Sequence, residues 1–243
     1  MTPAPAAARP CSTKLFFFDD PGPIDASRLG GKAATLARLG RQGLAVPAWF
    51  CVTTAFFDTP EESLLEAAHD ALFAGEAVAV RSSVVGEDSA VASFAGLMES
   101  YLNVHRAGLA EHIRRCRLSA FSGRALAYRR RLGLPIDGIG AAVIVQRMVD
   151  ARAAGVLFTR DVDGGSGSVV SAALGLGEGV VADRAESDTY WISRPDRAIR
   201  RRIATKTVRI ATDPAGSTRS EPVPADQGGA PVLEDGPLLA LVD

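Results

Sequence analysis

Residues 80–104 read VRSSVVGEDSAVASFAGLMESYLNV, and this stretch decides the fold more than any other. The apolar run at 77–80 predicts a buried strand that leads into Arg81. Arginine offers a planar, permanently charged fork of donors, and small residues such as those at 93–96 let the backbone approach phosphate oxygens. The stretch is therefore typical of a loop that grips a polyphosphate. An arginine paired with an acidic residue at 87–88, followed by a structural turn, is the alternative interpretation.

Helical and strand patterns alternate on both sides of this stretch. Within 30–44 a helix is expected to follow the glycines and lysine at 30–32 and to stop at Gly40 and Gly43. Further helices are expected at 61–73 and 109–131, the last as one long helix with a basic outer face. Strands are expected at 46–54, 141–149, 155–161, 168–174 and 188–194. Beyond Thr207 the composition favours coil, with a short strand at 207–210 and a helical turn near Leu238. The pattern predicts an α+β fold whose strand-rich half follows a hinge at about 135–140.

Composition excludes several classes of function. The formal net charge of -1 gives no electrostatic case for binding nucleic acid or a membrane surface, and no apolar run reaches the roughly 18–20 residues that span a bilayer. The N-terminus is rich in Pro and Ala and reads as a flexible tail over 1–13. The three cysteines are widely spaced, so a reduced, cytoplasmic setting is expected. Nothing in the composition indicates an oligomeric state.

Three further pieces suit phosphate chemistry. Gly30, Gly31 and Lys32 open a helix, where backbone donors and a mobile charge favour an anion, or they form an ordinary turn with a surface lysine. Gln146 lies on an apolar strand, where its side chain needs a hydrogen-bond partner. That partner would be the edge of an adenine, with Met148 packed on the ring. The alternative is that Gln146 lies on the outer face of a half-buried strand.

Glu178 stands among glycines in GLGEG at 175–179. Its carboxylate would bridge Mg²⁺ to phosphates, or the residue would simply lie exposed in a glycine-rich turn. Together, the basic groups, the Gln-bearing strand and this carboxylate match the needs of phosphoryl transfer. The GxxxxGK[ST] phosphate-loop motif is absent.

The order of these motifs resembles the N-terminal nucleotide-binding domain of the phosphoenolpyruvate synthase (pyruvate, water dikinase) and rifampicin phosphotransferase family, which is related to pyruvate, phosphate dikinase. The matching segments are GGKAATL at 30–36, VPAWFCVTT at 46–54, AVRSSVVGEDSAVASFAG at 79–96, YLNV at 101–104, VIVQRMV at 143–149, GVLFTRD at 155–161 and GLGEGVV at 175–181. Each segment is weak evidence, whereas their joint order is specific.

The resemblance implies an ATP-grasp fold in which two lobes hold ATP between them. The first lobe is expected at 14–137 and the second at 138–207. Residues 208–243 are expected to lead to a histidine-bearing swivel domain that this sequence lacks. The family moves a phosphoryl group from ATP to that histidine, with AMP and phosphate as products, and an acceptor domain then takes it from the phosphohistidine.

The resemblance also assigns roles to residues, with ATP and Mg²⁺ as cofactors. Lys32 and Arg81 would hold the phosphates and serve catalysis, with Ser82 beside them. The loop from Ser93 to Gly96 would cover the triphosphate. Gln146 and Met148 would contact the adenine. Glu178 would bind the metal ion, and Arg194 would be a further phosphate contact.

The sequence departs from the family pattern at several points. The segment between Phe57 and Ala77 looks shortened, and Leu97 and Met98 replace the usual glutamines. Trp191 stands near a polar metal or phosphate contact of some relatives. The family's Thr-Cys-His-Ala motif is absent. The leading hypothesis is therefore the ATP-binding part of a dikinase whose histidine and acceptor domains lie elsewhere. The alternatives are an ATP-activating module of an antibiotic-modifying or biosynthetic ligase system, and an inactive ATP-binding remnant.

Overall fold

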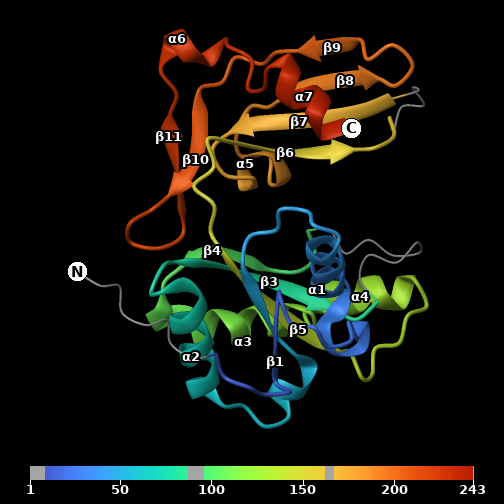
Figure 1. The fold of residues 1–243 in the computed structure, drawn as a ribbon, viewed down its shortest axis with the longest axis vertical. Coiled ribbons are helices and arrows are strands. Elements are labelled where there is room, and N and C mark those ends of the chain that lie inside the picture. Colours follow the sequence, from blue (N-terminus) through green and yellow to red (C-terminus); the bar gives the residue numbers. More distant parts are fainter. Residues whose placement is uncertain (1–8, 87–95, 162–166, 243) are drawn as a thin grey trace. The chain divides into compact units, whose positions relative to one another are not determined.

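The computed structural model describes residues 9–86, 96–161 and 167–242. The chain forms two compact units, Met1–Met148 and Val149–Asp243, and each is described by itself (Figure 1). Both combine helices with a sheet, so the α+β prediction is confirmed. The division falls later than the lobe boundary expected at 137/138, because the strand at 141–147 pairs within the sheet of the first unit.

The first unit is built on a five-stranded antiparallel sheet with the order β1-β2-β5-β3-β4. Its strands are β1 (Leu15–Phe17), β2 (Trp49–Val52), β3 (Val78–Val84), β4 (Ser100–Val104) and β5 (Ala141–Arg147). The central strand β5 is rich in β-branched residues and buried along almost its whole length, as expected of a strand covered on both faces.

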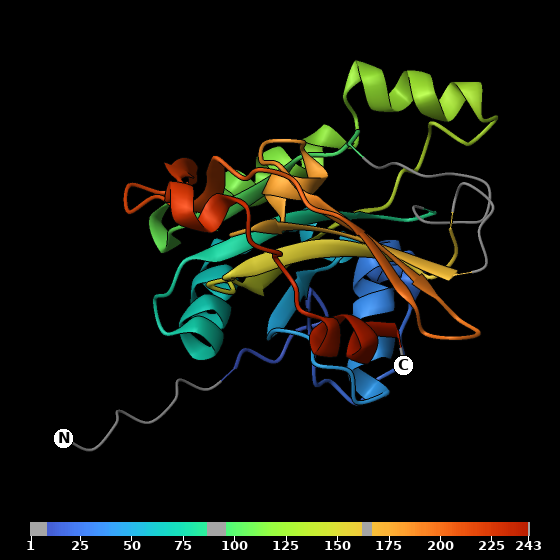
Figure 2. The same ribbon diagram turned by 90° about the horizontal axis from the view of Figure 1, so that it is seen from above.

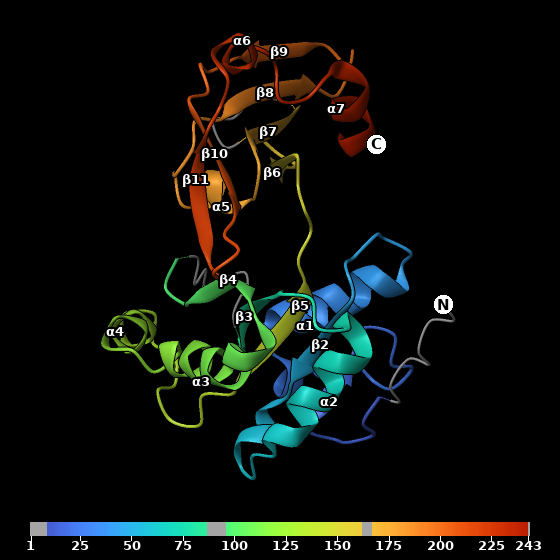
Figure 3. The ribbon, with the colours of Figure 1, turned by 90° about the vertical axis from the view of Figure 1, so that its left-hand side faces the viewer.

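Helices cover both faces of this sheet. Helix α1 (Ala26–Arg41) packs on one face, where Leu29 and Ala33 meet Trp49 and Ile144. Helices α2 (Glu62–Phe73) and α3 (Leu109–Ser119) lie together against the other face (Figure 3). Two short 3₁₀ turns, η1 (Thr54–Phe57) and η2 (Arg106–Gly108), complete the connections. The result is a three-layer unit with apolar clusters on both sides of the sheet.

The long helix expected at 109–131 is two helices. Helix α3 ends at Ser119, and α4 (Gly123–Arg131) starts after a break. Ser122 has extended backbone angles, and its hydroxyl accepts a hydrogen bond from the amide of Ala125 at 3.3 Å, which caps the second helix. The expectation failed because a serine N-cap followed by glycine stops a helix even where the basic pattern continues.

The second unit contains a four-stranded antiparallel sheet with the order β6-β7-β8-β9. These strands are β6 (Ala153–Phe158), β7 (Gly167–Leu174), β8 (Asp188–Ser193) and β9 (Ile199–Arg202), and the short helix α5 (Glu178–Val181) lies between β7 and β8 in sequence. A hairpin of β10 (Val208–Thr212) and β11 (Thr218–Pro222) is followed by α6 (Ala225–Gly228) and α7 (Asp235–Val242). Helix α7 packs along the sheet through Leu238 (Figures 1 and 2).

The segment beyond Thr207 was expected to be mostly coil, and the structure corrects this. The short strand expected at 207–210 agrees with β10, and the helical turn expected near Leu238 agrees with α7. Strand β11 and its pairing with β10 were missed, because β11 shows no strong apolar alternation. A buried polar centre then fastens the segment to the sheet. The carboxylate of Asp188 accepts hydrogen bonds from Lys206 Nζ at 2.9 Å, the Tyr190 hydroxyl at 2.8 Å and the Val232 amide at 2.7 Å. Burial raises the pKa of Tyr190 to about 12.

No helix in the described part of the chain has both the length and the apolar character needed to cross a membrane.

Candidate functional site

The turn that carries Lys32 is fastened to strand β3. Gly30 interrupts α1 with a φ of 74°, and a Cβ at this position would lie 2.0 Å from the carbonyl oxygen of Ser83. The Ser83 hydroxyl donates to the Leu29 carbonyl at 2.7 Å and accepts from the Ala33 amide at 3.0 Å. Only glycine tolerates both the backbone angle and the close approach. The backbone on either side of Lys32 is thereby fixed against the strand that contains Arg81.

Arg81, Ser83 and Gln146 lie on one face of the first sheet. In the antiparallel register of β3 and β5, Ala79 opposes Gln146 and Arg81 opposes Ile144. Residues directly opposite each other share a face, and Ile144 packs against α1. Arg81 and Gln146 therefore lie on the α1 side. Sequence reasoning placed Arg81 at the end of a strand, whereas β3 continues through it to Val84.

Arg81 is half-buried, and within residues 9–86, 96–161 and 167–242 its guanidinium has no hydrogen-bond or ion-pair partner. The two acidic residues that the sequence offers as ion-pair partners of Arg81, Glu87 and Asp88, lie outside the described residues. A partly desolvated cation gains most from an anion that completes its hydrogen bonds. This position on the sheet is therefore suited to an anionic ligand.

Ser82 is not brought together with Arg81. It is 2% exposed and opposes Val143, which belongs to the apolar cluster under α2 and α3. Because successive strand residues point to opposite faces, Ser82 lies on the other side of the sheet from Arg81.

Three of the remaining predicted residues of the first unit, Gly96, Gln146 and Met148, belong to its described part. Ser93 is outside the described residues. Gly96 has a φ of 70°, and its carbonyl accepts a hydrogen bond from the Arg124 guanidinium of α4. Gln146 is 8% exposed near the end of β5, and the half-buried Met148 follows it as the last residue of the unit.

In the second unit, Glu178 is the first residue of α5, and both of its carboxylate oxygens are engaged. Oε1 accepts from Arg184 Nη1 at 2.7 Å, and Oε2 accepts from the Thr218 hydroxyl of β11 at 2.6 Å. The turn before it is braced on β10, because the Leu176 amide donates to the Ile210 carbonyl at 2.8 Å. Glu178 is thus held in a defined position by three separate segments of the unit.

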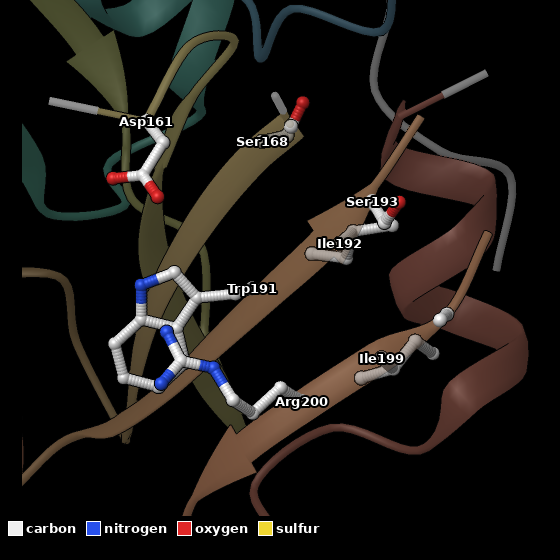
Figure 4. A pocket seen from close by; sticks show the side chains of 9 residues that line it. Asp161, Ser168, Trp191, Ile192, Ser193, Ile199 and Arg200 are labelled. Carbon is white, nitrogen blue, oxygen red and sulfur yellow. The ribbon is translucent and has the colours of Figure 1, made fainter. Parts of the chain in front are cut away.

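A shallow hollow of about 300 Å³ lies at the strand ends of the same unit (Figure 4). The Arg200 guanidinium stacks over the Trp191 ring, with 4.0 Å between the Arg200 Cζ and the ring centroid. Asp161 and Ser193 also line the hollow. The neighbouring Arg194 is exposed and donates to the Thr159 carbonyl at 2.6 Å.

Comparison with known proteins places these features in a family. The family described as "Pyruvate phosphate dikinase, AMP/ATP-binding domain" matches residues 60–243. The chain belongs to this family. The suspected resemblance is thereby confirmed. The dikinase-family match covers Arg81, Gln146 and Glu178 but begins after Lys32, so the assignment of Lys32 depends on the Gly30–Ser83 junction described above.

Individual relatives agree with the family match. A rifampicin phosphotransferase of Streptomyces sviceus is 35% identical over 90% of this chain, which spans 31% of that protein. A probable phosphoenolpyruvate synthase of Methanothermobacter thermautotrophicus is 29% identical over 93% of the chain, which spans 41% of that protein. The prodigiosin synthesizing transferase PigC of Serratia marcescens is 34% identical over 90%, and the chain spans 28% of it. The chain thus corresponds to less than half the length of these relatives, which have further domains.

Glu178 of the second unit is of the ligand type that suits the Mg²⁺ expected of a dikinase-family domain. Mg²⁺ prefers oxygen ligands, and it is usually held by one or two carboxylates together with phosphates and water. Glu178 supplies one such carboxylate. In the described ranges no three His, Cys, Asp or Glu side chains converge as a metal site. A cation at Glu178 would therefore take its other ligands from outside that set.

In the first unit sequence reasoning chose Ser82 instead of Ser83, and in the second unit it missed Arg184 and Thr218. Ser83 could have been found from strand alternation, because it stands two residues after Arg81 and so shares its face. Arg184 and Thr218 gave no signal, since their distances along the chain from Glu178 say nothing about contact. Their roles appear only when α5 and β11 are placed side by side by the fold.

Proposed function

We propose that this chain is the ATP-binding part of a dikinase-like phosphotransferase, with an ATP-grasp arrangement in which each unit supplies contacts to Mg-ATP. Lys32 and Arg81 contact the phosphates, and Gln146 and Met148 contact the adenine. Glu178 holds Mg²⁺, and Arg194 is a further phosphate contact. The loop from Ser93 to Gly96 covers the triphosphate. A bound Mg²⁺ would neutralise phosphate charge and orient the transferred group.

One observation carries this proposal. Arg81 is a half-buried cation without a partner in the described part of the chain, on the same sheet face as Gln146 and beside the glycine turn of Lys32. Structural arginines in this protein look different. Arg106 and Arg147, for example, bond to carboxylates. An anion such as a polyphosphate supplies the acceptors that Arg81 lacks.

Calorimetric titration of Mg-ATP into wild type, R81Q and the matched control R147Q tests the proposal. Arg147 lies on the neighbouring strand β5, on the opposite sheet face from Gln146, and pairs with Glu76. Loss of a charge-assisted hydrogen bond predicts roughly 10- to 100-fold weaker ATP binding for R81Q, whereas R147Q is expected to bind like wild type. Absence of ATP binding in the wild-type protein would refute the nucleotide assignment.

The chemical step needs a partner, which we propose is a histidine-bearing swivel domain together with an acceptor domain, in trans or in a C-terminal continuation. Incubation of the chain with labelled ATP and a separately supplied family histidine domain should yield AMP, phosphohistidine and inorganic phosphate, with water accepting the second phosphoryl group. If Mg-ATP binds but no AMP forms with such a partner, the phosphotransferase assignment is wrong and an inactive ATP-binding module is favoured.

The similarity to a prodigiosin synthesizing transferase favours a second candidate, an ATP-activating module in a biosynthetic or antibiotic-modifying system. The incubation with labelled ATP and a histidine domain distinguishes this candidate from the dikinase when possible acceptor molecules are added. Phosphoenolpyruvate formed from pyruvate supports the dikinase, and consumption of ATP only with another small molecule supports the second candidate.

A further inference from the structure

The Glu178 carboxylate is already occupied by a cationic side chain of the same unit. Arg184 Nη1 lies 2.7 Å from Oε1, and the two side chains are 36% and 29% exposed. Arg184 also donates to the Thr218 hydroxyl at 3.2 Å, and that hydroxyl donates to Oε2. The three side chains therefore form a closed cluster that satisfies both oxygens of the carboxylate.

The backbone is shaped to bring Arg184 back to Glu178. Helix α5 lasts a single turn, and Asp183 then takes a left-handed conformation with a φ of 53°, which is uncommon for a residue with a side chain. The Arg184 amide next donates to the Gly179 carbonyl at 2.9 Å. This reversal returns Arg184 to the start of the helix, so the contact with Glu178 is built into the local fold.

A carboxylate oxygen that accepts a hydrogen bond from a guanidinium cannot at the same time give its full charge to a metal ion. A guanidinium remains protonated at any physiological pH, so it competes with a divalent cation for Glu178 under all ordinary conditions. A half-exposed ion pair is weak, however, and a nucleotide-bound cation is able to displace it. The competition is therefore strong enough to shift metal affinity and weak enough to be overcome.

We propose that Arg184 is a positioning residue that holds Glu178 when no metal is bound and must release it before Mg²⁺ binds. Arg184 thereby sets the Mg²⁺ concentration at which nucleotide is taken up, and the released guanidinium becomes available to an anionic group. This inference rests on the proposed function, because it assumes that Glu178 receives the cation that accompanies ATP.

The experiment measures ATP binding as a function of Mg²⁺ in wild type, R184Q, R184K and E178Q. The matched control is R201Q, because Arg201 is as exposed as Arg184 and forms an ion pair with Asp235 in the same unit, away from Glu178. Removal of a weak competing ion pair predicts a Mg²⁺ midpoint about three- to fivefold lower for R184Q. R184K and R201Q should stay near wild type, and E178Q should need more Mg²⁺. An unchanged midpoint in R184Q overturns the proposal.

A second measurement keeps the inference separate from nucleotide binding. Mn²⁺ added to the nucleotide-free protein broadens amide signals close to its binding site, so the signals of Gly179 and Ala182 report on Glu178. We expect broadening at lower Mn²⁺ concentration in R184Q than in wild type or R201Q. Equal broadening in all three overturns the inference even if ATP binds. If ATP does not bind but R184Q still gains Mn²⁺ affinity, the proposed function fails and the role of Arg184 stands.

Discussion

The two units differ in how they hold a fully buried ionisable side chain. In the first unit His69 of α2 is fully buried, and neither ring nitrogen forms a hydrogen bond in the described part of the chain, while Nδ1 lies 3.7 Å from the Asp70 carboxylate. In the second unit Lys206 and Asp188 are both fully buried, and their charged groups are bonded to each other. The Asp188 carboxylate also accepts from the amides of Ala204 and Val232.

The difference follows from how much apolar surface each unit encloses. The first sheet has helices on both faces and buries Trp49, Phe50 and Phe73, and such a core tolerates one unsatisfied imidazole. The second unit has a smaller apolar cluster around Tyr190 and Leu238. It uses the Asp188 centre to attach the chain from 204 to 233, because satisfied buried polar groups specify a single arrangement.

The largest expected effect is removal of Lys206. K206M leaves Asp188 buried without its cation, which typically destabilises a protein by about 3–5 kcal/mol. Hydrogen exchange read by mass spectrometry should show lost protection in β8 and in 225–242, with little change in the first unit. The double variant D188N/K206M should recover part of the protection. Unchanged protection in K206M would show that the apolar contacts of α7 are enough to hold the C-terminal segment on the sheet without Lys206.

The next effect concerns the Gly30 junction in the first unit. G30A places a Cβ 2.0 Å from the Ser83 carbonyl oxygen at a φ of 74°, so we expect a loss of at least about 2 kcal/mol in unfolding free energy and weaker ATP binding. G40A is the control, because its Cβ meets nothing within 4 Å in the same helix. It should be neutral or slightly stabilising by helix propensity. Thermal unfolding checks both, and equal effects would remove the argument for a fixed junction.

The smallest effect is the pH dependence caused by His69. Burial lowers the pKa of this imidazole below its ordinary value of 6.5, so below about pH 6.5 the unfolded chain binds a proton that the folded chain resists. The free energy of unfolding of the first unit should have its full value above this pH and should decrease as the pH is lowered. H69L should flatten the profile of urea midpoints between pH 5 and 8. The exposed His105 gives the control H105Q, which should retain the slope of wild type.

Parts of the fold and the site follow from local patterns. The helix at 62–73 and the strand at 141–147 agree with the apolar patterns of their sequences. Such a pattern is local, because it is visible within one segment whichever surface the segment packs against. The break between α3 and α4 did not follow, nor did strand β11 and its pairing with β10. A single capping serine decided the first, and pairing between two weakly apolar strands decided the second.

The sequence by itself determined the α+β class, the family and the residue types suited to phosphate and metal, because these are recorded in short motifs and their order. Only the tertiary structure decided which of them meet. Ser82 and Ser83 are neighbours in sequence, yet strand alternation puts one in the core and the other against Gly30. Arg184 and Thr218 enclose Glu178 because a left-handed residue reverses the chain and β11 is placed beside α5. Contacts between distant residues depend on register and packing, which no single motif encodes.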